Sequence, residues 1–221
     1  MPKDFSLPNM VQDLHYAVNG TYVHQWLHSV CPPREGLTVL EPGCGCGKFG
    51  LSYALKGAHV TLFDIDQEVV EYCHRLKKAL DVLREGAFHF APFPLSTEIM
   101  VADLFTQGPY AHTANLVFNE GVPQHWPDEE HRQGCINRMA TWAKPGGLVV
   151  IVGNNGNNPR ELETDRSMKF TYEGMPPQRK CFTSLELVQR LEKAGLRQVQ
   201  TAYLGGGPGD AILIAGWGRK P

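Results

Sequence analysis

Short apolar runs alternate with stretches of helical periodicity along most of this chain. The runs predict strands at about 37–41, 59–63, 98–101, 116–118 and 148–152. Between them, apolar positions three and four residues apart predict helices. Strands that alternate with helices form a parallel sheet, because the chain must return across the sheet before each new strand. The pattern therefore predicts an α/β fold.

The two C-terminal strands, at about 197–204 and 211–216, are separated by the turn GGGPG at 205–209. Five residues are too few for a crossover helix, so these two strands must be antiparallel. The expected fold class is α/β, a mostly parallel twisted sheet of about seven strands with the last strand antiparallel and helices on both faces. Thr183 and Glu186 have the spacing of a capping box for the helix that precedes this hairpin, and Asp66 can cap the helix after the second strand. The residues KPGG at 144–147 predict a turn into the fifth strand.

Composition narrows the class of partner. The 221 residues carry a formal net charge of −2 without a long basic run, which disfavours a nucleic-acid partner. No segment approaches the about 20 apolar residues of a membrane span, and the N-terminus does not resemble a signal peptide. The six cysteines form no CxxC pair, so we expect no metal site and a reducing, cytoplasmic location.

The most informative segment is residues 37–66, a predicted strand–helix–strand unit. The first strand ends in Glu41, glycines follow at 43, 45 and 47, and the second strand ends in Asp64. A glycine turn between a strand and a helix, followed by an acid on the next strand, is typical of units that bind a nucleoside-containing cofactor. The segment therefore predicts such a site at the carboxyl end of the first strand.

Three classes of ligand have to be compared for a turn of this kind. Residues 45–50 satisfy GxGxxG, so a dinucleotide is an alternative, but Glu41 before the glycines does not favour a pyrophosphate. A Walker phosphate loop is excluded because Phe49 replaces the Ser or Thr that would hold magnesium. S-adenosylmethionine fits better, since its methionine end carries a sulfonium and an ammonium that suit an acidic residue.

Further residues are placed to bind the adenosine part of that donor. Asp64 can accept both ribose hydroxyls, and Asp103, after the third strand, can accept the adenine amino group. Ile65 and Leu104 can sandwich the adenine ring. Gly43, Gly45 and Gly47 let the backbone approach the amino-acid moiety.

With these features, the chain resembles the class I S-adenosylmethionine-dependent methyltransferases over about residues 35–216. The matching motifs are EPGCGCG at 41–47, VTLFDID ending at 66, MVADLF around Asp103, LVFNEGVPQHW at 116–126 and WAKPGG at 142–147. The resemblance implies that Asn119 faces the methionine end of the donor. Apolar residues at helical spacing predict an N-terminal helical lid at 1–35, and the resemblance implies a methyltransferase domain at 36–221 with an acceptor-lid insert at about 155–182.

The implied reaction is an in-line displacement, in which the enzyme chiefly aligns donor and acceptor. His125 is the candidate general base, although it could equally pack or cap the next helix. Glu120 could neutralise an amine acceptor or face solvent. Tyr22, or Tyr16, could reach the donor carboxylate. Arginines in the 155–182 segment favour an anionic or carboxylate-bearing acceptor, or simply form a solvated loop.

The expected function is methyl transfer from S-adenosylmethionine to a small-molecule acceptor. The alternatives are a protein or RNA methyltransferase, or a catalytically inert protein that binds S-adenosylmethionine. The sequence does not identify the acceptor atom or the oligomeric state.

Overall fold

The computed structural model describes residues 7–86, 94–105, 110–126, 128–160 and 181–221. The chain divides into two compact units, Met1–Thr106 and Gln107–Pro221. Most of the predicted insert, residues 161–180, lies outside the described residues, as do residues 1–6 of the predicted lid. No helix in the described ranges is both long and apolar enough to span a lipid bilayer.

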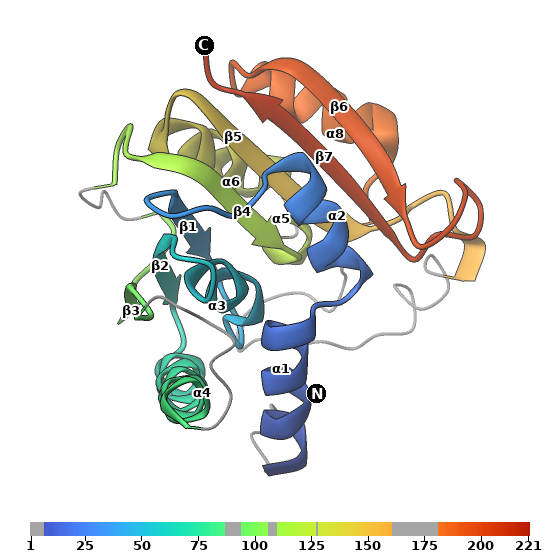
Figure 1. Cartoon of the computed structure of the whole chain (residues 1–221). Helices are drawn as coiled ribbons and strands as arrows, with labels where there is room; N and C mark the ends of the chain where they lie inside the picture. The colour runs from blue at the N-terminus through green and yellow to red at the C-terminus, as the bar shows by residue number, and fades with distance from the viewer. Residues whose placement is uncertain (1–6, 87–93, 106–109, 127, 161–180) are drawn as a thin grey trace. The chain divides into compact units, whose positions relative to one another are not determined.

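The first unit contains a parallel three-stranded arrangement in the order β3-β2-β1. Its strands are β1 (Thr38–Pro42), β2 (His59–Asp64) and β3 (Thr97–Val101), and its helices are α1 (Leu7–Asn19), α2 (Tyr22–Val30), α3 (Lys48–Ala54) and α4 (Gln67–Glu85) (Figure 1). Pro42 pairs with Phe63, and Asp64 pairs with Val101. The carboxyl ends of the three strands therefore lie at one edge.

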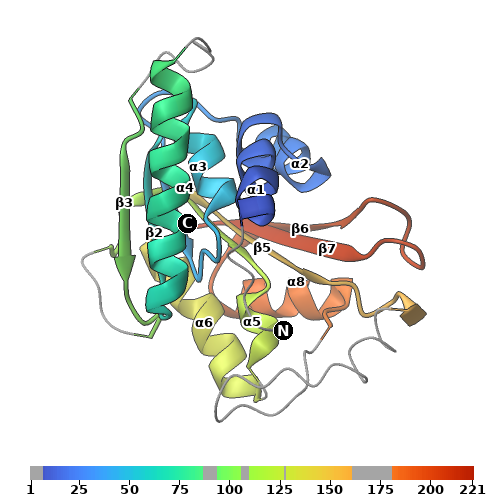
Figure 2. The same cartoon turned by 90° about the horizontal axis from the view of Figure 1, so that it is seen from below.

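The helices of this unit pack on its strands and on one another. α3 packs on β1 and β2, and α4 runs along β2 and β3 (Figure 2). α1 contacts both α3 and α4. The predicted cap of α4 is confirmed, because the Asp66 carboxylate accepts a hydrogen bond of 2.9 Å from the Glu68 N–H.

Aromatic and imidazole rings fix α2 on α3. His24 stacks on Phe49 with ring centroids 4.2 Å apart, and His28 meets Tyr53 edge-on at 4.8 Å. The Tyr53 hydroxyl donates to the Cys31 carbonyl at 2.7 Å. Burial lowers the pKa of both His24 and His28 to about 4. Both rings are therefore neutral at pH 7, and α2 packs against α3 without a buried imidazolium charge.

Gly50 allows α3 to approach the strands closely. A β-carbon at this position would lie 2.4 Å from Leu62 Cδ2 and 2.8 Å from both Val60 Cγ1 and Glu41 Oε2. The space between helix and sheet is thus filled by the side chains of β1 and β2. Glycine is unfavourable inside a helix, and the close packing of α3 on the strands explains why glycine occupies position 50.

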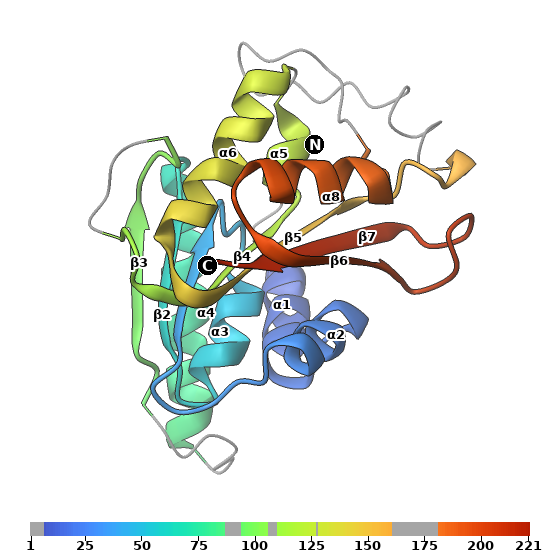
Figure 3. The ribbon, with the colours of Figure 1, turned by 90° about the horizontal axis from the view of Figure 1, so that it is seen from above.

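The second unit has its strands in the order β4-β5-β7-β6. They are β4 (Ala114–Glu120), β5 (Ala143–Asn154), β6 (Arg197–Leu204) and β7 (Leu213–Arg219), and the helices are α5 (Val122–His125), α6 (Glu129–Trp142) and α8 (Ser184–Lys193). β4 and β5 are parallel, whereas β7 is antiparallel to β5 and to β6. α8 lies across β6 and β7 (Figure 3), and α6 packs on β4 and β5.

The seven strands of the described residues confirm the predicted class, since the pairs β1–β2, β2–β3 and β4–β5 are parallel and the last strand, β7, is antiparallel to both β5 and β6. The predicted cap is present as well, with Thr183 Oγ1 accepting from the Glu186 N–H at 3.2 Å. The turn predicted at 144–147 lies within the bounds of β5. Ala114 of β4 pairs with Ala143 and Leu116 pairs with Leu148, so the turn forms an irregularity in the pairing of the two strands. The sequence did not predict α5, a single turn of four residues.

We expect Gly50→Ala to lower the free energy of unfolding by about 1–3 kcal/mol, because the new methyl group overpacks the interface of α3 with β1 and β2. Helix propensity alone predicts the opposite sign, a gain of about 1 kcal/mol. Chemical denaturation of both proteins measures the difference. Gly207→Ala is the matched control, because a β-carbon there meets no atom within 4 Å. A Gly50→Ala protein as stable as the parent would contradict this account of the packing.

Candidate active site

The turn between β1 and α3 depends on left-handed backbone conformations. Gly43, Gly45 and Gly47 have φ values of 59°, 55° and 72°. Residues with a β-carbon rarely adopt such angles. The turn is held by hydrogen bonds from Cys44 N–H to the Phe63 carbonyl at 3.0 Å and from Gly47 N–H to the Cys44 carbonyl at 2.8 Å.

The glycines at 45 and 47 serve different purposes. A β-carbon on Gly47 would lie 2.9 Å from Leu62 Cδ1 and 3.2 Å from Cys73 Sγ, so this glycine permits packing against the protein interior. A β-carbon on Gly45 would meet no atom within 4 Å, and the residue is exposed. Gly45 therefore leaves a bare stretch of backbone that a ligand can approach closely.

Asp64 is fixed beside this open backbone. Its Oδ2 accepts from the Gly45 N–H at 3.2 Å, and its Oδ1 accepts from the Asp66 N–H at 3.1 Å. The next residue, Ile65, has 67% of its surface exposed although it is a large apolar side chain. A carboxylate and an exposed apolar side chain thus adjoin at the end of β2.

Asp103 lies at the same edge of the first unit. It follows β3 by two residues, and Val101 at the end of β3 is the partner of Asp64. The Asp103 Oδ1 accepts from the Phe105 N–H at 2.9 Å. Leu104 is only 7% exposed, in contrast to Ile65. The structure thus brings Asp64, Ile65 and Asp103 to neighbouring strand ends, while most of Leu104 packs into the protein.

Glu41 lies behind the turn. It is 3% exposed, and its Oε2 accepts from the Gly50 N–H at 2.7 Å. A carboxylate at the beginning of a helix is stabilised by the helix dipole and by the otherwise unpaired N–H groups there. One oxygen of Glu41 therefore serves to join β1 to α3.

The predicted lid residues lie on the first two helices. Tyr22 begins α2 and is exposed. The Tyr16 hydroxyl accepts from Gln12 Nε2 at 2.6 Å. α1 is tied to α4 by the Tyr72 hydroxyl, which donates to Asp13 Oδ2 at 2.7 Å. This contact, 59 residues apart in sequence, was not predicted from the sequence pattern.

In the second unit, the predicted residues lie at the end of β4 and in α5. Asn119 is fully buried, and its Oδ1 accepts from the Val122 N–H at 2.9 Å, which stabilises the turn into α5. His125 folds back towards this turn, since its Nε2 would lie 3.9 Å from a β-carbon on Gly121. Glu120 is half-buried at the end of β4.

Sequence reasoning missed Gln124 as a structural residue of this segment. Gln124 is buried, its Oε1 accepts from the Asn154 N–H at 2.8 Å, and its Nε2 donates to Asn154 Oδ1 at 3.3 Å. The amide therefore joins α5 to the end of β5. No local pattern marks Gln124, because its partner Asn154 lies 30 residues further along the chain.

The thiols near the glycine turn are reduced; Cys44 and Cys73 are buried, and Cys46 is half-buried. Cys73 Sγ donates to the Gly45 carbonyl at 2.9 Å and lies 3.8 Å from Cys44 Sγ. The hydrogen bond with Cys73, together with burial, raises the pKa of Cys44 well above its ordinary value, and burial raises the pKa of Cys46 to about 12. Among the described residues, no group of three His, Cys, Asp or Glu side chains is arranged to hold a metal ion.

The family model and the curated relatives that this chain matches are all methyltransferases. A family model described as a methyltransferase domain matches residues 40–151, from β1 to β5. Phosphoethanolamine N-methyltransferase 1 of Triticum aestivum is 28% identical over 123 residues, which are 56% of this chain and 22% of that protein. The ubiquinone biosynthesis O-methyltransferase of Aeromonas salmonicida (strain A449) is 26% identical over 178 residues, which are 77% of this chain and 67% of that protein. The matched region thus spans about a fifth of the wheat enzyme.

Solved structures share the fold. A methyltransferase from Aquifex aeolicus, described as dependent on S-adenosylmethionine, superimposes with a TM-score of 0.65 at 15% identity, over 99% of this chain and 100% of the other. Structures with this fold also hold bound S-adenosylmethionine or S-adenosylhomocysteine. The predicted class, a mostly parallel α/β sheet with an antiparallel last strand, is thereby confirmed.

We expect the thiol of Cys46 to resist alkylation in the folded protein. At pH 8 a thiol with a pKa of about 12 is only about 0.01% ionised, whereas an ordinary cysteine is ionised by about 20%. Iodoacetamide labelling followed by peptide mass spectrometry should therefore give a rate at least about 100-fold slower than in the unfolded chain. Labelling of Cys46 at the unfolded rate, while the protein stays folded, would show that its pKa is not raised in the folded protein.

Proposed function

Since the chain belongs to the class I S-adenosylmethionine-dependent methyltransferases, we propose that it transfers the methyl group of S-adenosylmethionine to a small-molecule acceptor. The observation that supports the donor site most directly is the open backbone at Gly45 beside the fixed carboxylate of Asp64. The names of two relatives refer to small molecules, one to phosphoethanolamine and the other to ubiquinone biosynthesis. The net charge of −2 also favours a small acceptor over a polyanion.

Asp64 is suited to bind the ribose of the donor. Each of its oxygens accepts one backbone N–H and has a second lone pair available for a hydroxyl. Both ribose hydroxyls can therefore donate to one carboxylate that the backbone already orients. Gly43 and Gly45 would allow the amino-acid part of the donor to lie against bare backbone.

The adenine ring would lie between the ends of β2 and β3. Ile65 offers exposed apolar surface for one face of the ring, and the edge of Leu104 offers surface for the other. Asp103 would accept a hydrogen bond from the adenine amino group. Burial of Ile65 under the ring would remove apolar surface from water and so favour binding.

The methionine end would lie towards Glu41 and Gly47. Glu41 holds the turn through Gly50, and its negative charge favours the cationic end of the donor through space. Tyr22, exposed at the beginning of α2, would bind the donor carboxylate through its hydroxyl.

The donor sulfonium supplies an already activated methyl group. The residues of the chain then need to hold the acceptor atom in line at about 3–3.5 Å and exclude water. We propose that His125 removes the proton of a hydroxyl or amine acceptor, and that Glu120 offsets the positive charge of an amine. A packing role for His125, beside Gly121, is the competing interpretation.

Asp64→Asn should weaken the binding of S-adenosylhomocysteine by about 10- to 100-fold, because a hydrogen bond to a charged group contributes about 1.5–3 kcal/mol. Isothermal titration calorimetry measures this affinity. Asp66→Asn is the matched control, since Asn caps a helix as well as Asp does. The affinity of this variant for S-adenosylhomocysteine should equal that of the parent protein. Equal affinities for all three proteins would exclude the ribose role of Asp64.

His125→Ala should lower kcat by about 10²- to 10⁴-fold with an acceptor that must lose a proton, while the affinity for S-adenosylhomocysteine stays unchanged. The assay follows transfer of a labelled methyl group to phenol, catechol and primary amine acceptors. His131→Ala is the control, because His131 pairs with Asp128 on the exposed first turn of α6. An unchanged kcat in His125→Ala would leave His125 with a packing role.

A chain that binds S-adenosylhomocysteine but methylates none of these acceptors would favour the inert or macromolecular alternatives. A protein or RNA substrate would then be sought among cell fractions, and binding to RNA would weaken steeply with salt.

A further inference from the structure

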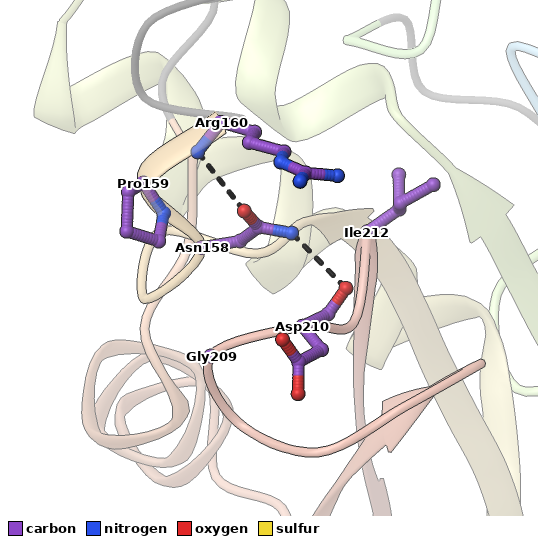
Figure 4. Close-up of a pocket in the computed structure, with 6 residues that line it drawn as sticks. All are labelled: Asn158, Pro159, Arg160, Gly209, Asp210 and Ile212. Atoms are coloured by element: carbon purple, nitrogen blue, oxygen red, sulfur yellow. Dashed lines mark hydrogen bonds between the residues drawn. The ribbon is translucent and has the colours of Figure 1, made fainter.

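A cavity of about 480 Å³ lies in the second unit between the segment after β5 and the turn that joins β6 to β7. Its lining residues are Asn158, Pro159, Arg160, Gly209, Asp210 and Ile212 (Figure 4). Small-molecule sites commonly have volumes of about 300–1,000 Å³. None of the motifs that support the donor site includes these residues.

Two asparagines hold the rims of this cavity together. Asn155 is fully buried, and its Nδ2 donates to the carbonyls of Pro208 at 2.8 Å and Ala211 at 2.9 Å. Asn158 is 4% exposed, and its Nδ2 donates to the carbonyls of Asp210 and Ala211, both at 3.1 Å. Buried side-chain amides that bridge two loops make the cavity a preformed feature of the fold.

The same amide positions Arg160. Asn158 Oδ1 accepts from the Arg160 N–H at 3.0 Å, so the backbone that carries the guanidinium is fixed (Figure 4). The guanidinium extends from this point towards Ile212, whereas the Asp210 carboxylate lies on the other side of the Asn158 side chain (Figure 4). Ile212 is 55% exposed. The cavity therefore presents a planar cation next to an apolar surface.

The guanidinium and the apolar surface together favour one class of ligand. A guanidinium binds carboxylate or phosphate oxygens through two parallel N–H donors. The adjacent apolar surface favours a ligand whose anionic group is attached to a carbon framework.

The position of the cavity agrees with an acceptor site. Asn119 and Glu120 at the end of β4 pair with Ile151 and Val152 of β5. The segment that follows Asn154 therefore begins at the same edge as the residues proposed to face the acceptor. Ligands of open α/β sheets bind beyond the carboxyl ends of the strands, which is this edge.

We propose that this cavity is an acceptor subsite, in which Arg160 binds a carboxylate or phosphate group and Ile212 contacts the carbon framework of the acceptor. This inference rests on the proposed function, because it specifies the class of acceptor. The acceptor is accordingly a small organic anion.

The test uses the full chain, ¹⁵N-labelled and saturated with S-adenosylhomocysteine. The probes are 4-hydroxybenzoate, phenyl phosphate and the neutral 4-hydroxybenzamide, and amide chemical shifts report the Kd and the location of binding. Both anions should shift residues 156–160 and 205–212, and the neutral amide should bind at least tenfold more weakly. The ratio of the two anion affinities distinguishes a carboxylate site from a phosphate site.

Variants assign the interaction to Arg160. Arg160→Gln should weaken both anions at least tenfold, and Arg160→Lys should recover part of the loss because it restores the charge without the planar fork. Asp210→Asn should leave the anion affinity unchanged or tighten it. Arg197→Gln is the matched control, an exposed arginine on β6 whose removal should change nothing.

Several results would overturn the subsite. They are equal binding of the neutral amide, unchanged affinity in Arg160→Gln, weaker anion binding in Asp210→Asn, shifts confined to other residues, or no binding of any probe. Calorimetry with S-adenosylhomocysteine alone separates the two hypotheses. If the chain does not bind S-adenosylhomocysteine, the proposed function is wrong. If it binds S-adenosylhomocysteine but none of the probes, only the subsite is wrong.

Discussion

The site depends on one hydrogen bond, from the Gly45 N–H to the Asp64 carboxylate at 3.2 Å. It joins the turn after β1 to the end of β2, and it requires a left-handed backbone at Gly45. The same carboxylate accepts from Asp66, whose own side chain caps α4. A ligand that binds Asp64 therefore meets a carboxylate that is already oriented, which lowers the conformational cost of binding.

The rest of the first unit supports that turn from behind. Glu41 accepts from Gly50 in α3, and the absence of a side chain at Gly50 lets the helix lie close to Leu62. Cys73 of α4 donates to the Gly45 carbonyl. Small side chains and buried hydrogen bonds therefore hold the backbone from the interior side, while the opposite side of Gly45 stays open.

The second unit relies on buried amides in a comparable way. Gln124 joins α5 to the end of β5, and Asn155 and Asn158 join the next segment to the hairpin of β6 and β7. Each amide satisfies backbone groups that would otherwise be buried without partners, a condition that costs about 1–3 kcal/mol per group. These bonds give a defined shape to segments without regular secondary structure, and the cavity beside Arg160 is a consequence.

Local features of the sequence determined most of the fold. The apolar runs located the strands, the spacing at 205–209 required an antiparallel pair, and Asp66 and Thr183 were recognisable caps. The glycine turn with its flanking acids also predicted the class of cofactor. These features were readable because each depends on residues close together in the chain or on the order of elements.

Only the tertiary structure decided which side chains face the open side of the site. In the folded chain, one oxygen of Glu41 accepts a hydrogen bond from α3, and Ile65 is exposed whereas most of Leu104 is buried. The strand β7 lies between β5 and β6. The tertiary structure also brought Asn158 to Ala211, 53 residues further along the chain. Periodicity and caps report neighbours within a few positions, whereas these contacts join residues that are distant in sequence and share no local pattern.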